Sequence, residues 1–397
     1  MNSKHPFYQI LFYSKLRRAA SVLLSVLMLL NMQSCTRVAN DTGVDNAHSL
    51  TFFAMDTAMS IKAYGEDRIF EYDDPPLEAA RDLAEALERK LSVTDEGSMI
   101  YRINHSNGAA ASVDSETLAL LGSALELCDK TEGNLDISIY PLVRAWGFTT
   151  DVYRVPGSDE IENLLKITDY RRIILSSEPA PEDPGTDDST AKSHVLSGSV
   201  KIENGMMIDL GAVAKGYAAE KIAGLLREKG IGSAVISLGG NIKTIGTKPD
   251  GGDWNIAIAA PARTGSDSYE SPPYAGFLRV SDMSVVTSGG YERYFEEGGK
   301  TYCHIIDPSS GRPVDKGILS VTIVATDSLI CDGLSTALFV MGADRATAYW
   351  RDNPEFDFII ITDENEILVT EGIENIFTPD ENYIKGISGR IRAVHLQ

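Results

Sequence analysis

The sequence is short of cysteine and of positive charge, and each shortage argues against a class of protein. Only four of the 397 residues are cysteine, and none belongs to a CxxC pair, so the chain has no framework of disulfides to rest on. The 57 acidic residues outnumber the 36 basic ones, which gives a formal net charge of −21. Broad binding to nucleic acid needs clustered lysine and arginine, so we expect no nucleic-acid partner. A nucleotide could still bind locally if a metal ion offset its charge.

The chain also lacks an apolar run long enough to cross a membrane comfortably, which takes about 20 residues. The run at 19–32 is shorter, follows a basic region at 15–18, and ends at a serine and Cys35. This is the pattern of a bacterial lipoprotein signal. We therefore predict a signal peptide over residues 1–34 and a lipid on Cys35. The protein would be exported and anchored at the outer face of the cytoplasmic membrane, which is the periplasmic side where an outer membrane is present. A signal anchor that stays attached is the alternative.

If Cys35 carries lipid, three cysteines remain for the folded part, at Cys128, Cys303 and Cys331. Their odd number and scattered spacing predict free thiols. A bridge between Cys303 and Cys331 is the alternative.

The rest of the chain indicates one folded body, since 43% of the residues are hydrophobic and suffice for a sizeable core. Residues 35–49 are polar and small and predict a tether. Residues 50–397 are the predicted domain, which opens with a strand over 51–64. Two stretches rich in Pro, Ser and acids, near 176–199 and 262–276, are predicted to be exposed insertions.

Apolar residues at helical spacing predict three helices, over 75–91, 114–128 and 213–229, the last one ending at Gly230. Runs of β-favouring residues predict strands over 233–238 and 319–325. No internal repeat is present. The sequence therefore predicts an α+β fold: a single large mixed domain with helices packed on an antiparallel or mixed sheet.

Asp332 and Thr336 stand four residues apart in a segment with helical apolar spacing, so their oxygen atoms would face the same side. Mg²⁺ prefers oxygen ligands and takes one or two carboxylates, leaving other positions to water and substrate phosphates. The pair is therefore a candidate metal site. In the alternative interpretation, Asp332 is an N-cap and Thr336 is a packed helix residue.

Residues 209–217 (DLGAVAKGY) lie where a strand would lead into a helix. Free N–H groups and the helix dipole at such a junction favour an anion, so this is a candidate phosphate site. Neither the Walker spacing nor a GxGxxG motif is present. Close packing explains Gly211 and Gly216 equally well.

His304 lies in a strand that ends in a turn at 307–308. Histidine moves protons near neutral pH, and transfer of a phosphoryl-linked group to a hydroxyl needs a base close to that hydroxyl. A hydrogen-bonded structural histidine is the alternative. The segment 287–294 offers hydroxyls, backbone donors and aromatic rings suited to a nucleotide, but it could equally be a turn before a strand.

Seven segments, in this order, closely resemble the ApbE family of FAD:protein FMN transferases, and the resemblance covers about residues 52–372. The segments are Met55–Thr57, Asp136–Phe148 (DISIYPLVRAWGF), Asp209–Tyr217 (DLGAVAKGY), Leu238–Asn241 (LGGN), Thr287–Phe295 (TSGGYERYF), His304–Pro308 (HIIDP) and Asp332–Leu338 (DGLSTAL). The resemblance implies an α+β fold with a central cleft. It also implies an enzyme that transfers the FMN half of FAD to a threonine or serine of an acceptor protein and releases AMP.

The matching positions imply the site residues. Mg²⁺ would be held on the pyrophosphate of FAD by Asp332, Thr336 and the carbonyl oxygen of Ala212, and His304 would handle the proton of the acceptor hydroxyl. The residues implied to contact FAD are Met55, Ala145, Trp146, Gly147, Asp209, Lys215, Thr287 and Ile306. By the same analogy the acceptor is a membrane-associated electron-transfer subunit, which this protein would meet through its lipid anchor.

Two positions depart from the family pattern. Asp56 stands where the family usually has glycine, and Thr94 stands where many members place a tyrosine over the flavin. A less covered ring would let water compete as acceptor, so a Mg²⁺-dependent FAD pyrophosphatase that yields FMN and AMP is the nearest alternative. A solute-binding lipoprotein is the alternative from another class.

Overall fold

A computed structural model of the protein describes residues 46–70, 75–150, 152–178, 196–261 and 274–396. The predicted signal peptide over 1–34, Cys35 and most of the predicted tether lie outside this part of the chain. Among the helices described, none has the length and apolar character needed to pass through a lipid bilayer.

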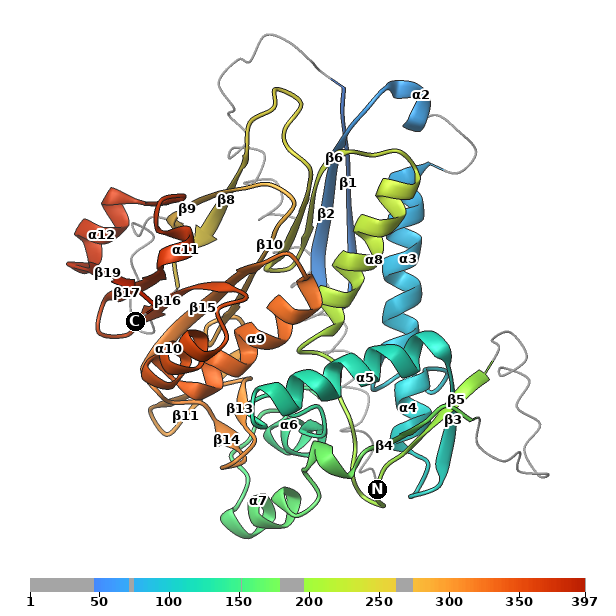
Figure 1. Ribbon diagram of the computed structural model, residues 1–397. Coiled ribbons are helices and arrows are strands. Elements are labelled where there is room, and N and C mark those ends of the chain that lie inside the picture. Colours follow the sequence, from blue (N-terminus) through green and yellow to red (C-terminus); the bar gives the residue numbers. More distant parts are fainter. Residues whose placement is uncertain (1–45, 71–74, 151, 179–195, 262–273, 397) are drawn as a thin grey trace, which may run out of the picture. The chain divides into compact units, whose positions relative to one another are not determined.

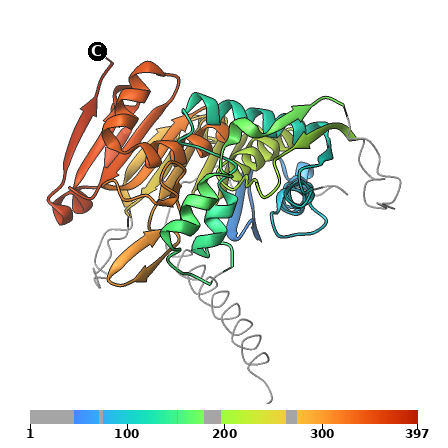
Figure 2. The same ribbon diagram turned by 90° about the horizontal axis from the view of Figure 1, so that it is seen from below.

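The described residues build one large mixed sheet of nine strands, in the order β1-β2-β6-β7-β10-β15-β16-β17-β19. All neighbouring pairs are antiparallel except β17 and β19. The strands are β1 (Ala47–Ala54), β2 (Thr57–Tyr64), β6 (Ser233–Leu238), β7 (Asn241–Ile245), β10 (Ser284–Gly289), β15 (Ile318–Ala325), β16 (Asp357–Thr362), β17 (Glu366–Thr370) and β19 (Arg390–Val394). Figure 2 shows the blue and the red ends of this sheet on opposite sides.

Helices cover one face of the large sheet (Figure 1). The apolar side chains of α3 and α8 pack on β1, β2 and β6, whereas those of α9 and α10 pack on β10, β15 and β16. Helix α5 packs on α9 and on β3 (Ala110–Asp114) and β5 (Leu196–Lys201). These helices are α3 (Pro76–Leu91), α5 (Ser115–Lys130), α8 (Ala214–Glu228), α9 (Ser328–Met341) and α10 (Ala343–Asp352). The predicted helices are thus confirmed, with Asp114 as the N-cap of α5 and Gly230 at a φ of 84° just after α8.

The opposite face of the sheet is covered by a three-stranded sheet of β8 (Trp254–Ala259), β9 (Tyr274–Val280) and β18 (Phe377–Pro379). The short helices α11 (Glu371–Glu374) and α12 (Glu381–Ile387) join this layer.

Smaller elements lie around the helical layer. The helices are α2 (Asp67–Phe70), α4 (Met99–Asn104), α6 (Tyr140–Trp146) and α7 (Ser158–Leu165), with a 3₁₀ turn η1 (Tyr170–Arg172). The strands are β3 (Ala110–Asp114), β4 (Ile174–Ser176) and β5 (Leu196–Lys201) in one sheet, β11 (Tyr294–Glu297) with β12 (Lys300–Cys303), and β13 (Ile306–Asp307) with β14 (Arg312–Pro313).

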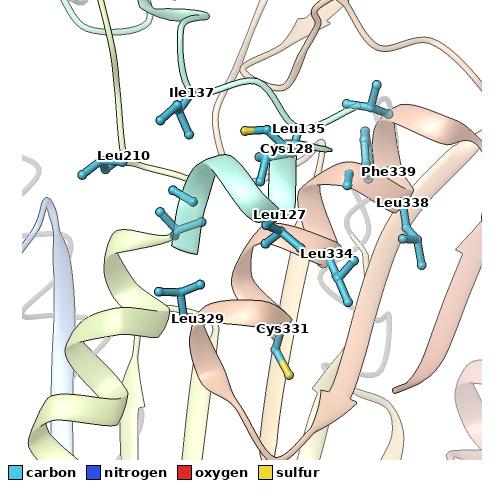
Figure 3. Packing of buried hydrophobic residues seen from close by; sticks show 14 of the residues in the cluster. Leu127, Cys128, Leu135, Ile137, Leu210, Leu329, Cys331, Leu334, Leu338 and Phe339 are labelled. Carbon is cyan, nitrogen blue, oxygen red and sulfur yellow. The ribbon is translucent and has the colours of Figure 1, made fainter. Parts of the chain in front are cut away.

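Helix α9 is the most enclosed element of the fold. All of its side chains are buried except those of Ile330 and Thr336, which are half-buried. Figure 3 shows Leu127 of α5 facing Leu334 of α9 within the main apolar cluster. An α-helix that is apolar all round must be surrounded by protein or lipid. Here strands β10 and β15 and helices α5, α8 and α10 surround it.

Some sequence expectations differ from the structure. The expected single strand over 51–64 is wrong, because Met55 and Asp56 adopt positive φ angles of 49° and 58° and turn the chain between β1 and β2. The segment 207–210 forms only an isolated bridge, from Met207 to Ile139. Strand β1 begins at Ala47, inside the predicted tether. Strands β4, β5 and β9 include the ends of the predicted insertions, whose centres at 179–195 and 262–273 lie outside the described residues.

The three cysteines of the described chain are buried and free, as predicted, so the alternative bridge between Cys303 and Cys331 is not formed. Burial raises the pKa of the Cys128 thiol to about 12 and also raises those of Cys303 and Cys331. All three thiols therefore act as small apolar groups in the core.

Candidate active site

One pocket gathers most of the residues singled out in the sequence. Its cavity of about 210 Å³ lies over the start of α8 and the middle of α9, beside the ends of β6 and β10. Eight predicted site residues line it, and they are Asp209, Ala212, Lys215, Thr287, His304, Ile306, Asp332 and Thr336. These residues come from segments up to 127 positions apart in the chain, so the fold alone brings them together.

The contact between α8 and α9 fixes the position of Asp332 in this pocket. The backbone N–H of Gly216, in the first turn of α8, donates to Oδ2 of Asp332 at 2.8 Å. A Cβ atom on Gly216 would lie 2.2 Å from the carbonyl oxygen of Ser328 and 2.8 Å from Cβ of Asp332. Only glycine lets the two helices approach this closely. The N-cap of α9 is Asp327, so the alternative interpretation of Asp332 as that N-cap is wrong.

The surroundings of Asp332 suit a hard cation. Its carboxylate is buried, and Thr336 follows one turn later on the pocket side of the same helix. Ala212 borders the pocket from the turn before α8. The fully buried carboxamide of Asn241 lies near enough to lower the pKa of Asp332, yet neither its oxygen nor its nitrogen has a well-formed hydrogen bond. Buried polar atoms without a hydrogen-bond partner are rare, so we expect this amide to contact a polar ligand.

No group of three or more His, Cys, Asp or Glu side chains capable of holding a metal occurs in the described ranges. A closed all-protein metal cage is therefore absent from that part of the chain. The oxygen atoms beside Asp332 instead fit Mg²⁺, which is commonly bound through one or two carboxylates plus water and substrate phosphates.

Charges of both signs face one another across the pocket. Burial raises the pKa values of Asp209, Glu292 and Asp332, and the positive charge of Lys215 opposes the rise in each case. Arg293 lines the same pocket. Among the side chains that the structure describes, none forms an ion pair with Lys215 or Arg293, so both cations remain available to an anionic ligand. Phosphate groups are the ligands that such a pair suits.

His304 is held as a neutral imidazole of defined tautomer. Its Nδ1 lies 3.2 Å from the carbonyl oxygen of Arg293, which can only accept, so Nδ1 carries the proton and Nε2 is left with a lone pair. Burial lowers the pKa of His304 to about 4, and the charges of Arg293 and Lys215 add to this effect. The ring of Phe148 meets the imidazole edge to face, with 6.4 Å between ring centres.

Three of the predicted flavin contacts lie beside this pocket without lining it. Trp146 is fully buried, and its indole N–H donates to the carbonyl oxygen of Gly311 at 2.9 Å. Gly147 ends α6 at a φ of 88°, and Ala145 faces a second, more open depression. Phe148 and Thr149, the next residues along the chain, line the pocket instead.

Met55 packs on the cluster beneath α3 and α8 and does not line the pocket. Thr57, two residues further along the chain, nevertheless lies against the pocket wall. A Cβ atom on the lining residue Gly239 would lie 2.3 Å from Oγ1 of Thr57. Asp56 takes the left-handed conformation, which aspartate tolerates better than most residues, so it can replace a glycine there. Thr94 is exposed in the turn after α3 and is not a lining residue.

Sequence reasoning gave no role to several residues that line or border the pocket. Asp136 is buried and accepts hydrogen bonds from the backbone N–H and the hydroxyl of Ser138, at 2.7 and 2.6 Å. The others are Asn134, Asn241, Glu292 and Arg293. Four of these five residues lie inside segments already quoted for the family resemblance, so the resemblance could have indicated them as site residues.

The comparisons with known proteins agree on one family. The profile of the ApbE family matches residues 55–360. A protein of Klebsiella pneumoniae (strain 342) called FAD:protein FMN transferase is 31% identical over 318 residues, which are 80% of this chain and 92% of that protein. A protein of the same description from Treponema pallidum (strain Nichols) is 34% identical over 309 residues, which are 75% of this chain and 80% of the relative.

A solved structure leads to the same conclusion. The crystal structure of the ApbE protein from Thermotoga maritima superposes with a TM-score of 0.67 at 30% sequence identity, covering 85% of this chain and 98% of that one. With most of both chains aligned, the fold and the sequence agree, and this chain belongs to the ApbE family.

Proposed function

We propose that this protein, a transferase of the ApbE family, uses Mg²⁺ to cleave FAD and transfers the FMN half to a threonine or serine hydroxyl of an acceptor protein, with release of AMP. The observation that carries the proposal is that one pocket brings Asp332, Thr336 and Ala212 together with His304, Lys215 and Arg293. The relatives described as FAD:protein FMN transferases support the reaction type.

In this proposal Asp332, Thr336 and the carbonyl oxygen of Ala212 hold the metal. A divalent ion there would polarise the phosphate bridge of FAD and offset its negative charge. The buried Asn241 amide beside Asp332 supplies a further polar group. The hydrogen bond from Gly216 orients the carboxylate before any ion arrives.

Lys215 and Arg293 neutralise the phosphate oxygens from the protein side. Lys215 lies in the first turn of α8, where the helix dipole adds partial positive charge. Phosphoryl transfer depends mainly on position and on charge stabilisation, so two fixed cations and a helix N-terminus are suitable catalytic groups.

His304 acts on the acceptor. The neutral Nε2 atom accepts the hydroxyl proton as the hydroxyl oxygen forms a bond to the phosphorus on the FMN side. The bond from that phosphorus to the bridging oxygen breaks, and AMP leaves with the electron pair. Because the Arg293 carbonyl keeps the proton on Nδ1, Nε2 is the nitrogen free to serve as the base.

The deciding experiment incubates the protein with FAD, Mg²⁺ and a threonine-containing acceptor. AMP together with flavin bound covalently to the acceptor supports transfer. AMP together with free FMN would instead support the pyrophosphatase alternative, for which the exposed Thr94 is the motivating departure. Unchanged FAD would leave only binding, as expected of a solute-binding lipoprotein, and would refute the proposal.

We also propose that the protein is exported and anchored by lipid at Cys35, where it would meet a membrane-bound electron-transfer subunit as its acceptor. The support is the basic and apolar pattern that precedes Cys35. Detergent phase separation of the wild type and of Cys35→Ser in a bacterial host tests this. The wild type should enter the detergent phase and the variant should not, and equal partitioning would contradict lipidation.

A further inference from the structure

Helices α8 and α9 cap each other's first turns at two points. The N–H of Gly216 on α8 donates to Asp332 on α9 at 2.8 Å. The N–H of Ser328 on α9 donates to Oε1 of Glu220 on α8 at 2.7 Å. Gly216 and Glu220 are four residues apart, and so are Ser328 and Asp332. The two hydrogen bonds therefore join facing stripes of an antiparallel helix pair, one helical turn apart.

The strand beneath the two helices supports both contacts. Asn241 and Lys243 of β7 are two residues apart, so they point to the same face of the sheet. Asn241 lies beside Asp332, and Lys243 donates to Oε1 of Glu220 at 2.8 Å and to the carbonyl oxygen of Thr326. Lys243 is only 3% exposed. A lysine buried this deeply needs a specific partner, and Glu220 is that partner.

Glu220 completes the capping of α9. The N-cap Asp327 accepts from the N–H groups of Leu329 and Ile330, at 2.8 and 3.1 Å. Asp327 does not bind the N–H of Ser328, and Glu220 accepts the hydrogen bond from that group instead. The hydroxyl of Ser328 lies 2.6 Å from that of Ser284 on β10. The beginning of α9 is thus fixed to α8 and to the sheet.

This anchorage determines where Asp332 stands. Asp332 follows Ser328 by one turn, and Gly216 leaves no side chain between the helices. A slide of α9 along α8 would therefore move the carboxylate relative to Ala212, which precedes α8. Metal and catalytic groups need their positions held to within about 0.5 Å, and groups behind the ligands supply much of that precision.

We propose that Glu220 and Lys243 are positioning residues of the metal site. They hold α9 against α8, so that Asp332 on one helix and the Ala212 carbonyl before the other face the same ion. This inference rests on the proposed function, because it assigns these two residues a role towards Mg²⁺. A purely structural ion pair is the competing explanation, and the experiment must separate the two.

Glu116 provides a matched control. Its carboxylate accepts from Lys90 at 2.6 Å, from the hydroxyl of Tyr217 at 2.8 Å and from Lys221 at 3.0 Å. It therefore ties α8 to α3 and α5 with three partners, against the two of Glu220, and among the hydrogen bonds of the described residues it makes none to α9. Replacing it should cost stability without moving Asp332.

The experiment compares the wild type with Glu220→Ala, Glu220→Gln, Lys243→Met and Glu116→Ala. Binding of Mn²⁺ alone is followed by electron paramagnetic resonance, without turnover. In parallel, AMP release is measured against Mg²⁺ concentration at saturating FAD, and the melting temperature of the metal-free proteins is recorded.

We expect Glu220→Ala and Lys243→Met to weaken Mn²⁺ binding by about ten-fold or more and to raise the Mg²⁺ concentration that gives half-maximal AMP release. The maximal rate at high Mg²⁺ should largely return. Glu220→Gln keeps an oxygen acceptor for the Ser328 N–H, so its effect should be smaller. If Glu220→Ala fails to fold, Glu220→Gln and Lys243→Met carry the test.

Unchanged Mn²⁺ affinity in the Glu220 and Lys243 variants would overturn the proposal, and so would an equal loss in Glu116→Ala. These outcomes leave wild-type flavin transfer intact. A wild-type protein that binds no Mn²⁺ and shows no Mg²⁺-dependent AMP release would instead overturn the metal assignment together with this inference. The two failures are thus distinguishable.

Discussion

The carbonyl oxygen of Arg293 accepts a hydrogen bond from Nδ1 of His304 at 3.2 Å, and both residues line the same pocket. One residue therefore acts on the histidine in two ways. Its backbone selects the tautomer, and its positive charge lowers the pKa of the ring. The backbone hydrogen bond by itself raises the pKa of the ring, but burial and the charge of Arg293 outweigh it. Nε2 is therefore unprotonated at neutral pH, which is the state a general base needs.

The first prediction concerns the pH dependence of flavin transfer. With the pKa of His304 lowered to about 4, the neutral base is complete at pH 6 to 8 and is lost as the pH falls through about 4. We expect the ionisation of His304 to leave kcat/KM for transfer unchanged near neutral pH. Below about pH 5, protonation of His304 should lower kcat/KM and give an acid limb in the pH profile. His304→Gln should transfer poorly while still binding FAD. An acid limb centred at pH 6.5 or above would contradict the assignment.

Removal of the Arg293 charge should change the same profile. In Arg293→Met the pKa of His304 rises, because a neighbouring positive charge is gone, and the acid limb should move to higher pH. The variant should also bind FAD about ten-fold or more weakly in a flavin-fluorescence titration, since a hydrogen bond to a charged group contributes about 1.5–3 kcal/mol. Arg279→Met is the control, because Arg279 lies on β9 and does not line the pocket. A profile identical to wild type would refute the coupling.

Gly216→Ala should separate α8 from α9. The added Cβ would overlap the carbonyl oxygen of Ser328 at 2.2 Å, and such overpacking costs about 1–3 kcal/mol or more. Gly224→Ala on the same helix is the matched control, because a Cβ there meets nothing within 4 Å. Alanine should be neutral or stabilising by up to about 1 kcal/mol at that position. Urea denaturation of both variants measures the difference, and equal stabilities would contradict the close contact.

Asp332→Asn should abolish activity while preserving or raising the stability of the metal-free protein. Burial raises the pKa of Asp332, so the charged form is disfavoured, and the metal-free protein loses stability as the pH rises through that pKa. The neutral amide removes this cost and can still accept from Gly216. We expect a melting temperature at or above that of wild type without metal, no increase on adding Mg²⁺, and AMP release at background with or without acceptor. Retained Mg²⁺-dependent turnover would remove the metal assignment.

Much of the fold could be predicted from local patterns, because the long helices and strands have strong periodicity. The turn at Met55 and Asp56 could not. The pair Met-Asp is not one of the dipeptides that usually signal a hairpin, and the β-rich pattern continues through the turn from β1 into β2. The N-cap of α9 could not be predicted either, because the mostly apolar sequence of the helix does not mark where it begins, and Asp327 takes that place rather than Asp332.

The candidate site was predictable where a motif supplied it, and less so where packing decided. Asp332, Thr336, Lys215 and His304 line the expected pocket. Trp146 does not, because its indole N–H bonds to Gly311, 165 residues further on. No local pattern records such a contact. Glu220 and Lys243 were missed for the same reason, since the roles inferred for them depend on how two helices and a strand meet.

The burial of α9 on nearly every side also limits how the site can move. Its peptide groups should be among the slowest in the molecule to exchange hydrogen with solvent, because exposing them requires the surrounding core to open. The carboxylate of Asp332 is therefore as fixed as the core itself. If Asp332 holds a metal ion as proposed, that ion could leave through the pocket and return to the same ligands without any refolding of the chain.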